Sequence, residues 1–214
     1  LKELEHLENE NPEYFDVNSP TQRVGGSVTK SFTTSVHSTP MYSLDNSYSL
    51  EDLKEWEKRI KKIIDTPIEY TCELKFDGVS INLTYKDGEL VRAVTRGDGV
   101  KGDDVTNNVK TIPTVPLKLR GDFKGEFEAR GEIVMPVSGF NKLNLSRIEN
   151  GEEPFKNPRN TASGSLKLQD SKEVSKRPLE CLLYSVEDSK MFNNHIEFLK
   201  NAKSYGFNIY KTYK

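Results

Sequence analysis

Lys75 lies in a short stretch, CELKFDG, whose residue types could form a covalent bond with a phosphate. The stretch follows a run typical of a β-strand, and its last two residues, Asp77 and Gly78, signal a turn. Glu73 precedes Lys75 by two positions, so in an extended chain both side chains face the same way. A lysine can attack phosphorus only after burial or a neighbouring cation lowers its pKa from about 10.4.

The K-x-D-G pattern also fits a plain surface hairpin with a solvated lysine paired to Asp77. The pattern is short and therefore of low specificity by itself. Choosing between these two interpretations therefore requires evidence from other stretches of the chain.

A glycine-rich loop, TRGDG, follows the strands around Lys75 and holds Arg96. Two glycines within three residues let a backbone come close to a ligand. The planar guanidinium of Arg96 can bind a phosphate or stack on a base. Farther on, Asp103 and Asp104 open a short predicted helix, so we interpret them as partners of its dipole rather than as metal ligands.

Glu132 lies within a predicted strand and is followed by apolar residues, which places a carboxylate in or near the core. A buried carboxylate needs a partner, and a salt bridge with Arg130 or a lysine would provide one. Later in the chain, Arg159, Lys167 and Lys156 form a local basic cluster that could meet phosphates. The alternative for this cluster is an ordinary solvated face.

The chain resembles one family, the NAD-dependent DNA ligases of bacteria, in six stretches that occur in the same order. These stretches are SPTQRVGG (19–26), MYSLDN (41–46), CELKFDG (72–78), TRGDGVKGDDVTNNVKTI (95–112), RGEIVMP (130–136) and FKNPRNTASGSLKLQD (155–170). Together they span most of the sequence.

The resemblance implies that Lys75 is the nucleophile that takes up AMP. It further implies that the residues binding the nucleotide are Ser43, Leu44, Glu73, Asp77, Gly78, Arg96 and Glu132. Glu73 would read the adenine amino group, and Glu132 would bind the ribose hydroxyls or hold the metal near Lys75. Leu44 could equally be a core residue. No side chain is assigned as a metal ligand in its own right.

Arg159 and Lys167 are the residues that the resemblance assigns to nucleic acid. The family usually has arginine at the position of Lys167. Lysine lacks the bidentate geometry of arginine, which weakens the expectation for that contact.

The implied reaction is adenylation of the lysine by NAD with release of nicotinamide mononucleotide (NMN), followed by transfer of AMP to the 5′-phosphate at a DNA nick. The 3′-hydroxyl then displaces AMP and seals the nick. NAD and Mg²⁺ are the expected cofactors, with zinc only in parts of the ligase outside this chain. The expected partner is nicked double-stranded DNA. The ligase is expected to be a monomer that acts in the cytoplasm during DNA replication and repair.

The resemblance divides the chain into residues 1–30, the tail of an NMN-binding helical module with a linker, and residues 31–214, part of the adenylation domain. Further lysines that contact the adenylate would follow Lys214, so we expect this piece alone to be inactive. Two alternatives stay open. One is an ATP-dependent ligase or RNA-capping nucleotidyltransferase, and the other is a non-catalytic module that binds nucleotide or DNA.

The strands and helices that must position these residues indicate a fold of the α+β class. The resemblance specifies the nucleotidyltransferase fold, which is ATP-grasp-like, with antiparallel sheets and a truncated C-terminus. Periodicity and turn signals predict strands over residues 68–74, 79–85, 90–94, 127–135 and 179–186, the last with Tyr184 in the core. Helices are predicted over residues 1–10, 49–65, 103–109, 137–150, 161–168 and 195–205.

Composition sets wide limits on the function. With 214 residues, 34% hydrophobic and 30% charged, the chain can form one domain with a core. The net charge of −2 means that any contact with DNA depends on a local basic face. Two cysteines without metal spacing indicate a reducing compartment. No signal peptide or long apolar run is present, so we expect no membrane contact, and none of the three histidines has a spacing typical of a metal site or a general base.

Overall fold

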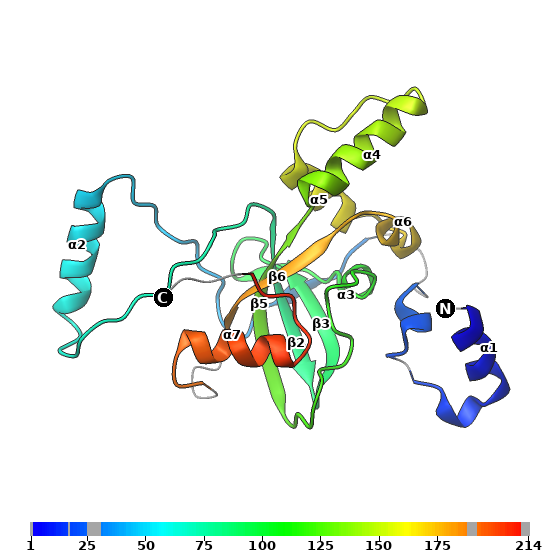
Figure 1. Cartoon of the computed structure of the whole chain (residues 1–214), viewed down its shortest axis with the longest axis horizontal. Helices are drawn as coiled ribbons and strands as arrows, with labels where there is room; N and C mark the ends of the chain where they lie inside the picture. Colours follow the sequence, from blue (N-terminus) through cyan, green and yellow to red (C-terminus); the bar gives the residue numbers. More distant parts are fainter. Residues whose placement is uncertain (1, 17, 25–30, 188–191, 211–214) are drawn as a thin grey trace.

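The computed structural model describes residues 2–16, 18–24, 31–187 and 192–210. Its centre is a four-stranded antiparallel sheet in the order β3-β2-β5-β6 (Figure 1). The strands are β2 (Val79–Lys86), β3 (Glu89–Thr95), β5 (Glu126–Val134) and β6 (Glu180–Val186). A second sheet pairs β1 (Thr34–Val36) with β4 (Lys101–Asp103). Helices outside antiparallel sheets confirm the predicted α+β class.

The two faces of the four-stranded sheet differ sharply because side chains alternate along each strand. One face carries Ile81, Leu83 and Tyr85 of β2, all fully buried. Phe127 and Ile133 of β5 point to the same side and join one continuous apolar core. The core is completed by residues in or beside α3 (Thr106–Val109), α5 (Pro158–Leu166), α6 (Ser171–Ser175) and α7 (His195–Ser204).

The opposite face of the sheet is polar. Ser80 and Asn82 of β2 lie opposite Glu132 and Arg130 of β5 in the strand register. The alternation therefore places the candidate carboxylate Glu132 on the face that does not form the core. This face carries the candidate site.

The turn between β2 and β3 agrees with its sequence signal. Asp87 and Gly88 both have positive φ, 48° and 81°, as a tight two-residue hairpin turn requires. The Asp87 carboxylate also accepts a hydrogen bond of 2.9 Å from the backbone N–H of Gly125. The strands predicted around this turn are therefore confirmed.

The predicted strand over residues 68–74 is wrong. Apart from a single bridge residue at Cys72, this segment has no strand structure, and Leu74 is 61% exposed. Both sides of β2 are already paired, with β3 and β5, so the sheet offers no neighbouring position there. Lys75 consequently lies on an extended connection that enters β2 rather than at the end of a strand.

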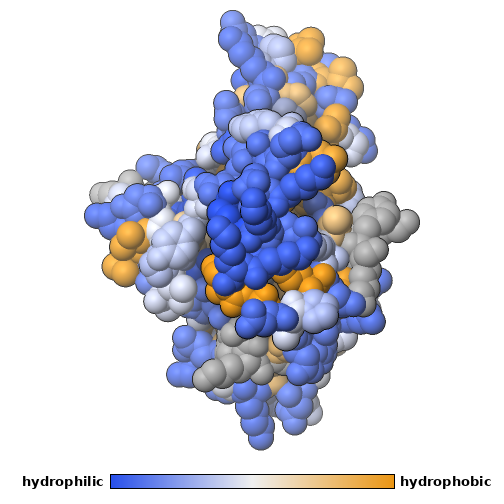
Figure 2. All heavy atoms as spheres, turned by 90° about the vertical axis from the view of Figure 1, so that its left-hand side faces the viewer, coloured by the Kyte–Doolittle hydropathy of each residue, from blue (hydrophilic) through white to orange (hydrophobic). Residues whose placement is uncertain are grey.

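Helix α2 (Leu50–Lys61) begins where the sequence predicts. Ser49 and Asp52 form a capping box, with both reciprocal hydrogen bonds at 3.1 Å. The helix lies well apart from the sheet, on the opposite side of the molecule from α1 (Lys2–Glu10) (Figure 1). Its apolar stripe, including Leu53 and Trp56, is exposed. Figure 2 views the molecule from the side on which α2 lies and shows hydrophobic side chains among hydrophilic ones.

The other predicted helices are confirmed with small shifts, except near residue 103. Helix α4 (Val137–Glu149) packs Phe140 and Leu143 against the core. Helix α3 begins only at Thr106, because Asp103 belongs to β4. Asp104 nevertheless accepts a hydrogen bond from the backbone N–H of Thr106, which keeps an acid at the start of the helix.

The predicted linker, which follows α1 within residues 1–30, is attached to the body of the protein. It contains two short 3₁₀ segments, η1 (Pro12–Tyr14) and η2 (Pro20–Val24). The guanidinium of Arg23 donates hydrogen bonds of 3.1–3.2 Å to the carbonyls of Lys110, Ile112 and Val115. Gly25 and Gly26 of the SPTQRVGG stretch and the boundary between residues 30 and 31 lie outside the described residues. Among the described helices, none is long and apolar enough to cross a membrane.

Candidate active site

The candidate site is organised by one hydrogen bond between distant parts of the chain. The backbone N–H of Gly78 donates to the Glu132 carboxylate at 3.0 Å. A Cβ atom at position 78 would lie 2.2 Å from the carbonyl oxygen of Ile133, so only glycine lets the turn approach β5 so closely. The K-x-D-G turn and the carboxylate strand are thus joined directly.

The charges of three cations act on this carboxylate. Burial raises the pKa of Glu132, while the Gly78 N–H and the charges of Lys75, Arg159 and Arg96 lower it, and burial is the largest effect. The cations come from three separate stretches: the connection into β2, the start of α5 and the loop after β3. Three predicted site cations thus influence a single carboxylate.

Tyr184 is also part of this cluster, which corrects its predicted place in the core. Its ring is 37% exposed, and its hydroxyl lies 2.7 Å from the Ser80 hydroxyl. Glu132 and Arg96 are near enough to affect its pKa, which burial raises. Leu182 pairs with Glu132, so alternation along β6 places Tyr184, two positions later, on the same polar side of the sheet. The apolar run over residues 179–186 hides this alternation.

The backbone of Arg96 is held from two sides. Its N–H donates to the carbonyl of Ser80 at 3.0 Å, and its carbonyl lies 3.1 Å from Nε2 of His37. Within the same loop, the Asp98 carboxylate accepts 2.9 Å hydrogen bonds from the backbone N–H groups of Val100 and Lys101. Hydrogen bonds from these backbone groups, with Lys101 first, lower the pKa of Asp98.

The glycine at position 97 is required by the geometry of this loop itself. Gly97 has φ +57°, and a Cβ there would lie 2.0 Å from the backbone carbonyl of Lys101. Gly97→Ala should therefore lower the free energy of unfolding by about 1–3 kcal/mol for the backbone strain, with the clash adding to it. Denaturant unfolding measures this change.

Gly121→Ala is the matched control for this prediction. Gly121 also has positive φ, +91°, but a Cβ there would meet nothing within 4 Å. This variant isolates the conformational cost of positive φ from the steric clash. Equal destabilisation by the two substitutions would contradict the close contact assigned to Gly97.

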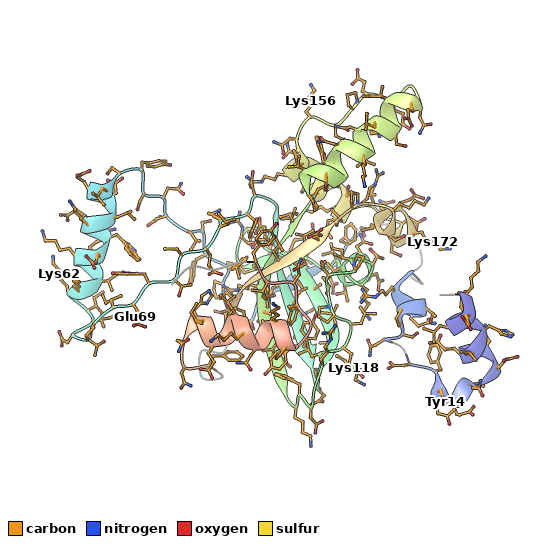
Figure 3. The ribbon with its side chains drawn as sticks, viewed as in Figure 1. Tyr14, Lys62, Glu69, Lys118, Lys156 and Lys172 are labelled. Carbon is orange, nitrogen blue, oxygen red and sulfur yellow. The ribbon has the colours of Figure 1, made fainter. Side chains whose placement is uncertain are left out.

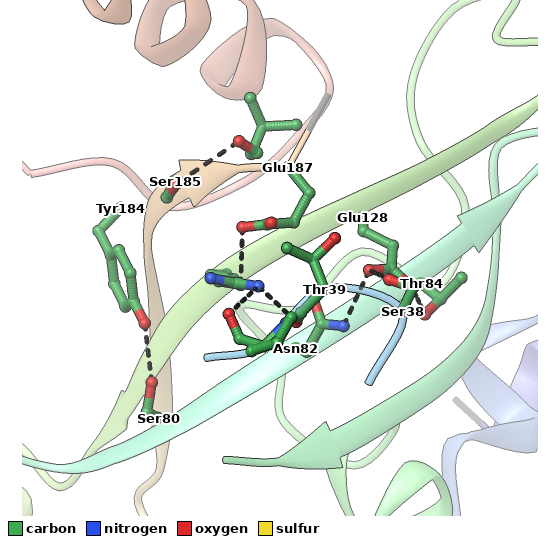
Figure 4. A network of polar contacts seen from close by, with 12 residues as sticks. Ser38, Thr39, Ser80, Asn82, Thr84, Glu128, Tyr184, Ser185 and Glu187 are labelled. Carbon is green, nitrogen blue, oxygen red and sulfur yellow. Dashed lines mark hydrogen bonds and ion pairs between the residues drawn. The ribbon is translucent and has the colours of Figure 1, made fainter. Parts of the chain in front are cut away.

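A buried polar network connects the segment before Ser43 to the sheet (Figure 4). The Glu128 carboxylate, 8% exposed, accepts hydrogen bonds from Ser38 at 2.5 Å and Asn82 at 3.2 Å. The Arg130 guanidinium donates to the carbonyls of Thr39 and Pro40 and forms an ion pair with Glu187 at 2.7 Å. Arg130 therefore binds Glu187 and backbone carbonyls, not Glu132 as the simplest sequence interpretation had it.

This anchored segment leads to the two residues expected to touch NAD. Met41 donates from its backbone N–H to Gly99 at 2.8 Å, which fastens the segment to the Arg96 loop. Ser43 then lies beside Arg96, with Nη1 and Oγ 3.4 Å apart. Leu44 is 75% exposed, so the alternative of a core leucine is wrong.

Lys75 and Glu73 are exposed on the connection into β2. Oε2 of Glu73 lies 2.5 Å from Nε2 of His195, the first residue of α7. This histidine is a site residue that spacing could not reveal, because it lies 122 positions from its partner. No hydrogen bond or ion pair involves the Lys75 amine within the described residues, so the amine is free to meet a substrate.

The residues assigned to nucleic acid are each paired with an acid. Arg159 contacts Asp77 at 3.0 Å, and Lys167 contacts Asp103 at 2.7 Å. Lys156 lies on the loop beside α4, away from the sheet (Figure 3). The three cations therefore do not form one unpaired cluster, and Arg159 belongs to the surroundings of Lys75 instead.

Comparisons with known proteins identify the family of the chain. Residues 29–214 match the family described as NAD-dependent DNA ligase adenylation domain. DNA ligases of Flavobacterium psychrophilum and Christiangramia forsetii are 62% and 61% identical over 99% and 98% of this chain, and the ligase of Cytophaga hutchinsonii is 49% identical over 100% of this chain. The chain spans 32% of the length of each of these relatives. It belongs to the NAD-dependent DNA ligase adenylation domain family.

Proposed function

We propose that this chain forms the part of an NAD-dependent DNA ligase in which Lys75 receives AMP from NAD. The observation that carries the proposal is the hydrogen bond from Gly78 to Glu132. It joins the lysine turn to a carboxylate whose pKa the charges of Arg96 and Arg159 also lower, and Arg159 contacts Asp77 of the same turn at 3.0 Å. Guanidinium groups near a nucleophile suit attack on a phosphate.

The reaction is a substitution at phosphorus. The lone pair of the neutral Lys75 amine attacks the α-phosphate of the AMP half of NAD and forms a P–N bond, and the nitrogen releases one proton to water. The pyrophosphate P–O bond breaks, and NMN leaves with the electron pair on its phosphate. Arg96 and Arg159 stabilise the negative charge on the oxygens that surround the reacting phosphorus.

The remaining predicted residues would bind the nucleoside. Glu73 accepts a hydrogen bond from the adenine amino group, and Glu132 accepts from the ribose hydroxyls through the oxygen that Gly78 does not occupy. The exposed ring of Tyr184 offers an apolar face to the base. Ser43, Leu44 and Asp77 complete the site around Arg96 and Lys75, and Leu44 contributes apolar contact area.

Mg²⁺ fits this site only together with the substrate. Within the described residues, no three acidic, histidine or cysteine side chains converge as metal ligands. Mg²⁺ is often held by one or two carboxylates together with substrate phosphates and water. Glu132 is the carboxylate that would take that part in place of the ribose contact, and the bound ion would offset charge on the phosphates.

The later steps concern the whole ligase. AMP passes from Lys75 to the 5′-phosphate at a nick in double-stranded DNA, and the 3′-hydroxyl then displaces it. Arg159 and Lys167 would meet DNA phosphates by exchanging their present acid partners for them. We further propose an ATP-grasp-like nucleotidyltransferase fold, with residues 1–30 belonging to an NMN-binding module and residues 31–214 to the adenylation domain. The whole ligase would act as a monomer in the cytoplasm, in DNA replication and repair.

The choice of AMP donor tests the proposal. The full-length ligase that contains this chain should become labelled by NAD carrying a radioactive adenylate, and not by equally labelled ATP. The family match supports NAD as the donor. Labelling by ATP alone would favour an ATP-dependent nucleotidyltransferase, and labelling by neither would favour a non-catalytic module.

A further inference from the structure

The carboxylate of Glu73 needs an anchor that its own segment does not provide. Glu73 lies on the connection over residues 67–78, which contains no helix or strand and only a single bridge residue, at Cys72. A side chain that recognises a base through one hydrogen bond must keep its accepting atom within a fraction of an ångström of the required position. The anchor must therefore come from another part of the fold.

His195 is in a position to provide this anchor. Its Nε2 lies 2.5 Å from Oε2 of Glu73, and the two side chains are 36% and 30% exposed. As the ring N–H donor, Nε2 occupies Oε2 and leaves Oε1 without a hydrogen-bond partner in the described part of the chain. One oxygen of the carboxylate is thus held, and the other is open to a ligand.

The imidazole itself is rigidly supported. Its ring packs 5.6 Å from the ring of Phe198, which in turn packs 5.6 Å from Phe192. Phe198 is buried in the core, and α7 is capped by Asn194, whose side chain accepts from the backbone N–H of Glu197 at 2.9 Å. The core therefore supports the histidine, and the histidine can hold the Glu73 carboxylate, which has no other partner among the described residues.

We propose that His195 is a positioning residue that orients Glu73 to recognise the amino group of adenine. The inference rests on the proposed function, since it takes the Glu73 site to be the adenine pocket. It adds a determinant of base specificity that lies on α7, outside the nucleotide-binding stretches. His195 acts through Glu73 and does not touch the base.

The test compares two nucleotides that differ only in this amino group. Calorimetry on the full-length protein that contains this chain gives the Kd for AMP and for purine riboside 5′-monophosphate, which lacks the amino group. The wild type should prefer AMP by about tenfold or more, the factor of one hydrogen bond to a charged group. His195→Ala should reduce that preference to roughly twofold and leave the Kd of the analogue unchanged.

Three further variants separate positioning from a general structural role. His195→Gln keeps an N–H donor and should restore most of the preference for AMP. In the Glu73→Ala background, His195→Ala should have no additional effect on the preference. His6→Ala is the matched control, because it removes a histidine that pairs with Glu10 at 3.3 Å on α1 and should change neither Kd.

The outcomes distinguish this inference from the proposed function. A wild-type preference that survives His195→Ala, or an equal loss of affinity for both nucleotides, overturns the positioning role alone. A wild type that binds both nucleotides equally well overturns the adenine role of Glu73 and this inference with it. Circular dichroism melting of each variant verifies that α7 remains folded.

Discussion

Replacing Lys75 with alanine should abolish the covalent AMP adduct in the full-length ligase while leaving the fold intact. The attacking nitrogen disappears, and none of the nearby arginines can form a stable bond to AMP in its place. The side chain is exposed and lies outside the apolar core, so the free energy of unfolding should change by less than about 0.5 kcal/mol. Labelled NAD followed by denaturing electrophoresis measures the adduct.

Lys86→Ala is the control for this experiment. Lys86 is another exposed lysine, at the far end of β2 from the K-x-D-G turn. This variant should be labelled as strongly as the wild type. Labelling that persists in Lys75→Ala would show that another residue is the nucleophile.

Glu132→Ala should slow adenylation by roughly 10²-fold, the cost of a small displacement of a reacting group. The substitution removes the acceptor for the Gly78 N–H and with it the link between the lysine turn and β5. The Gly78 N–H loses its acceptor, which should lower the free energy of unfolding by about 1–3 kcal/mol where this N–H stays buried. Removing a carboxylate that is partly desolvated offsets some of this loss. Single-turnover labelling by NAD gives the rate, and denaturant unfolding gives the stability.

Glu126→Gln is the matched variant for Glu132→Ala. Glu126 is an exposed glutamate at the opposite end of the same strand. Its neutralisation should leave the adenylation rate within about twofold. A comparable rate for Glu132→Ala and Glu126→Gln would show that Glu132 does not organise the site.

Local signals in the sequence predicted most of the sheet and the helices. Alternation identified β5, strand-like runs identified β2 and β6, and the Asp87-Gly88 turn identified the hairpin because only a few residue types tolerate positive φ. The Ser49 and Asp52 pair marked the start of α2. These signals depend on residues within a few positions of one another, which is why the sequence alone contains them.

The run over residues 68–74 shows where such signals fail. Its residue types suit a strand, but a strand also needs a neighbour, and both sides of β2 are occupied. Tyr184 was misplaced because its strand is a nearly continuous apolar run, and only the pairing of Leu182 with Glu132 shows which alternate side chains face the site. Pairing and register are properties of the whole sheet, and propensity does not contain them.

The candidate site could be predicted only in part. The stretches containing Lys75, Arg96 and Glu132 stood out by residue type and by family resemblance. Their convergence depends on contacts across long sequence separations, such as the 54 positions between Gly78 and Glu132. His195 carried no signal at all, because a single histidine at the start of a helix is common and its partner lies far away in the chain.

Mass spectrometry of the full-length ligase after incubation with NAD and Mg²⁺ tests the central claim most directly. Our account predicts that the intact protein gains the mass of one AMP and that peptide mapping places this AMP on Lys75. Incubation of the adduct with NMN should then remove the added mass, because the reaction at phosphorus is reversible. An adduct on any other residue, or no adduct under conditions in which the ligase seals nicks, would contradict the role assigned to Lys75.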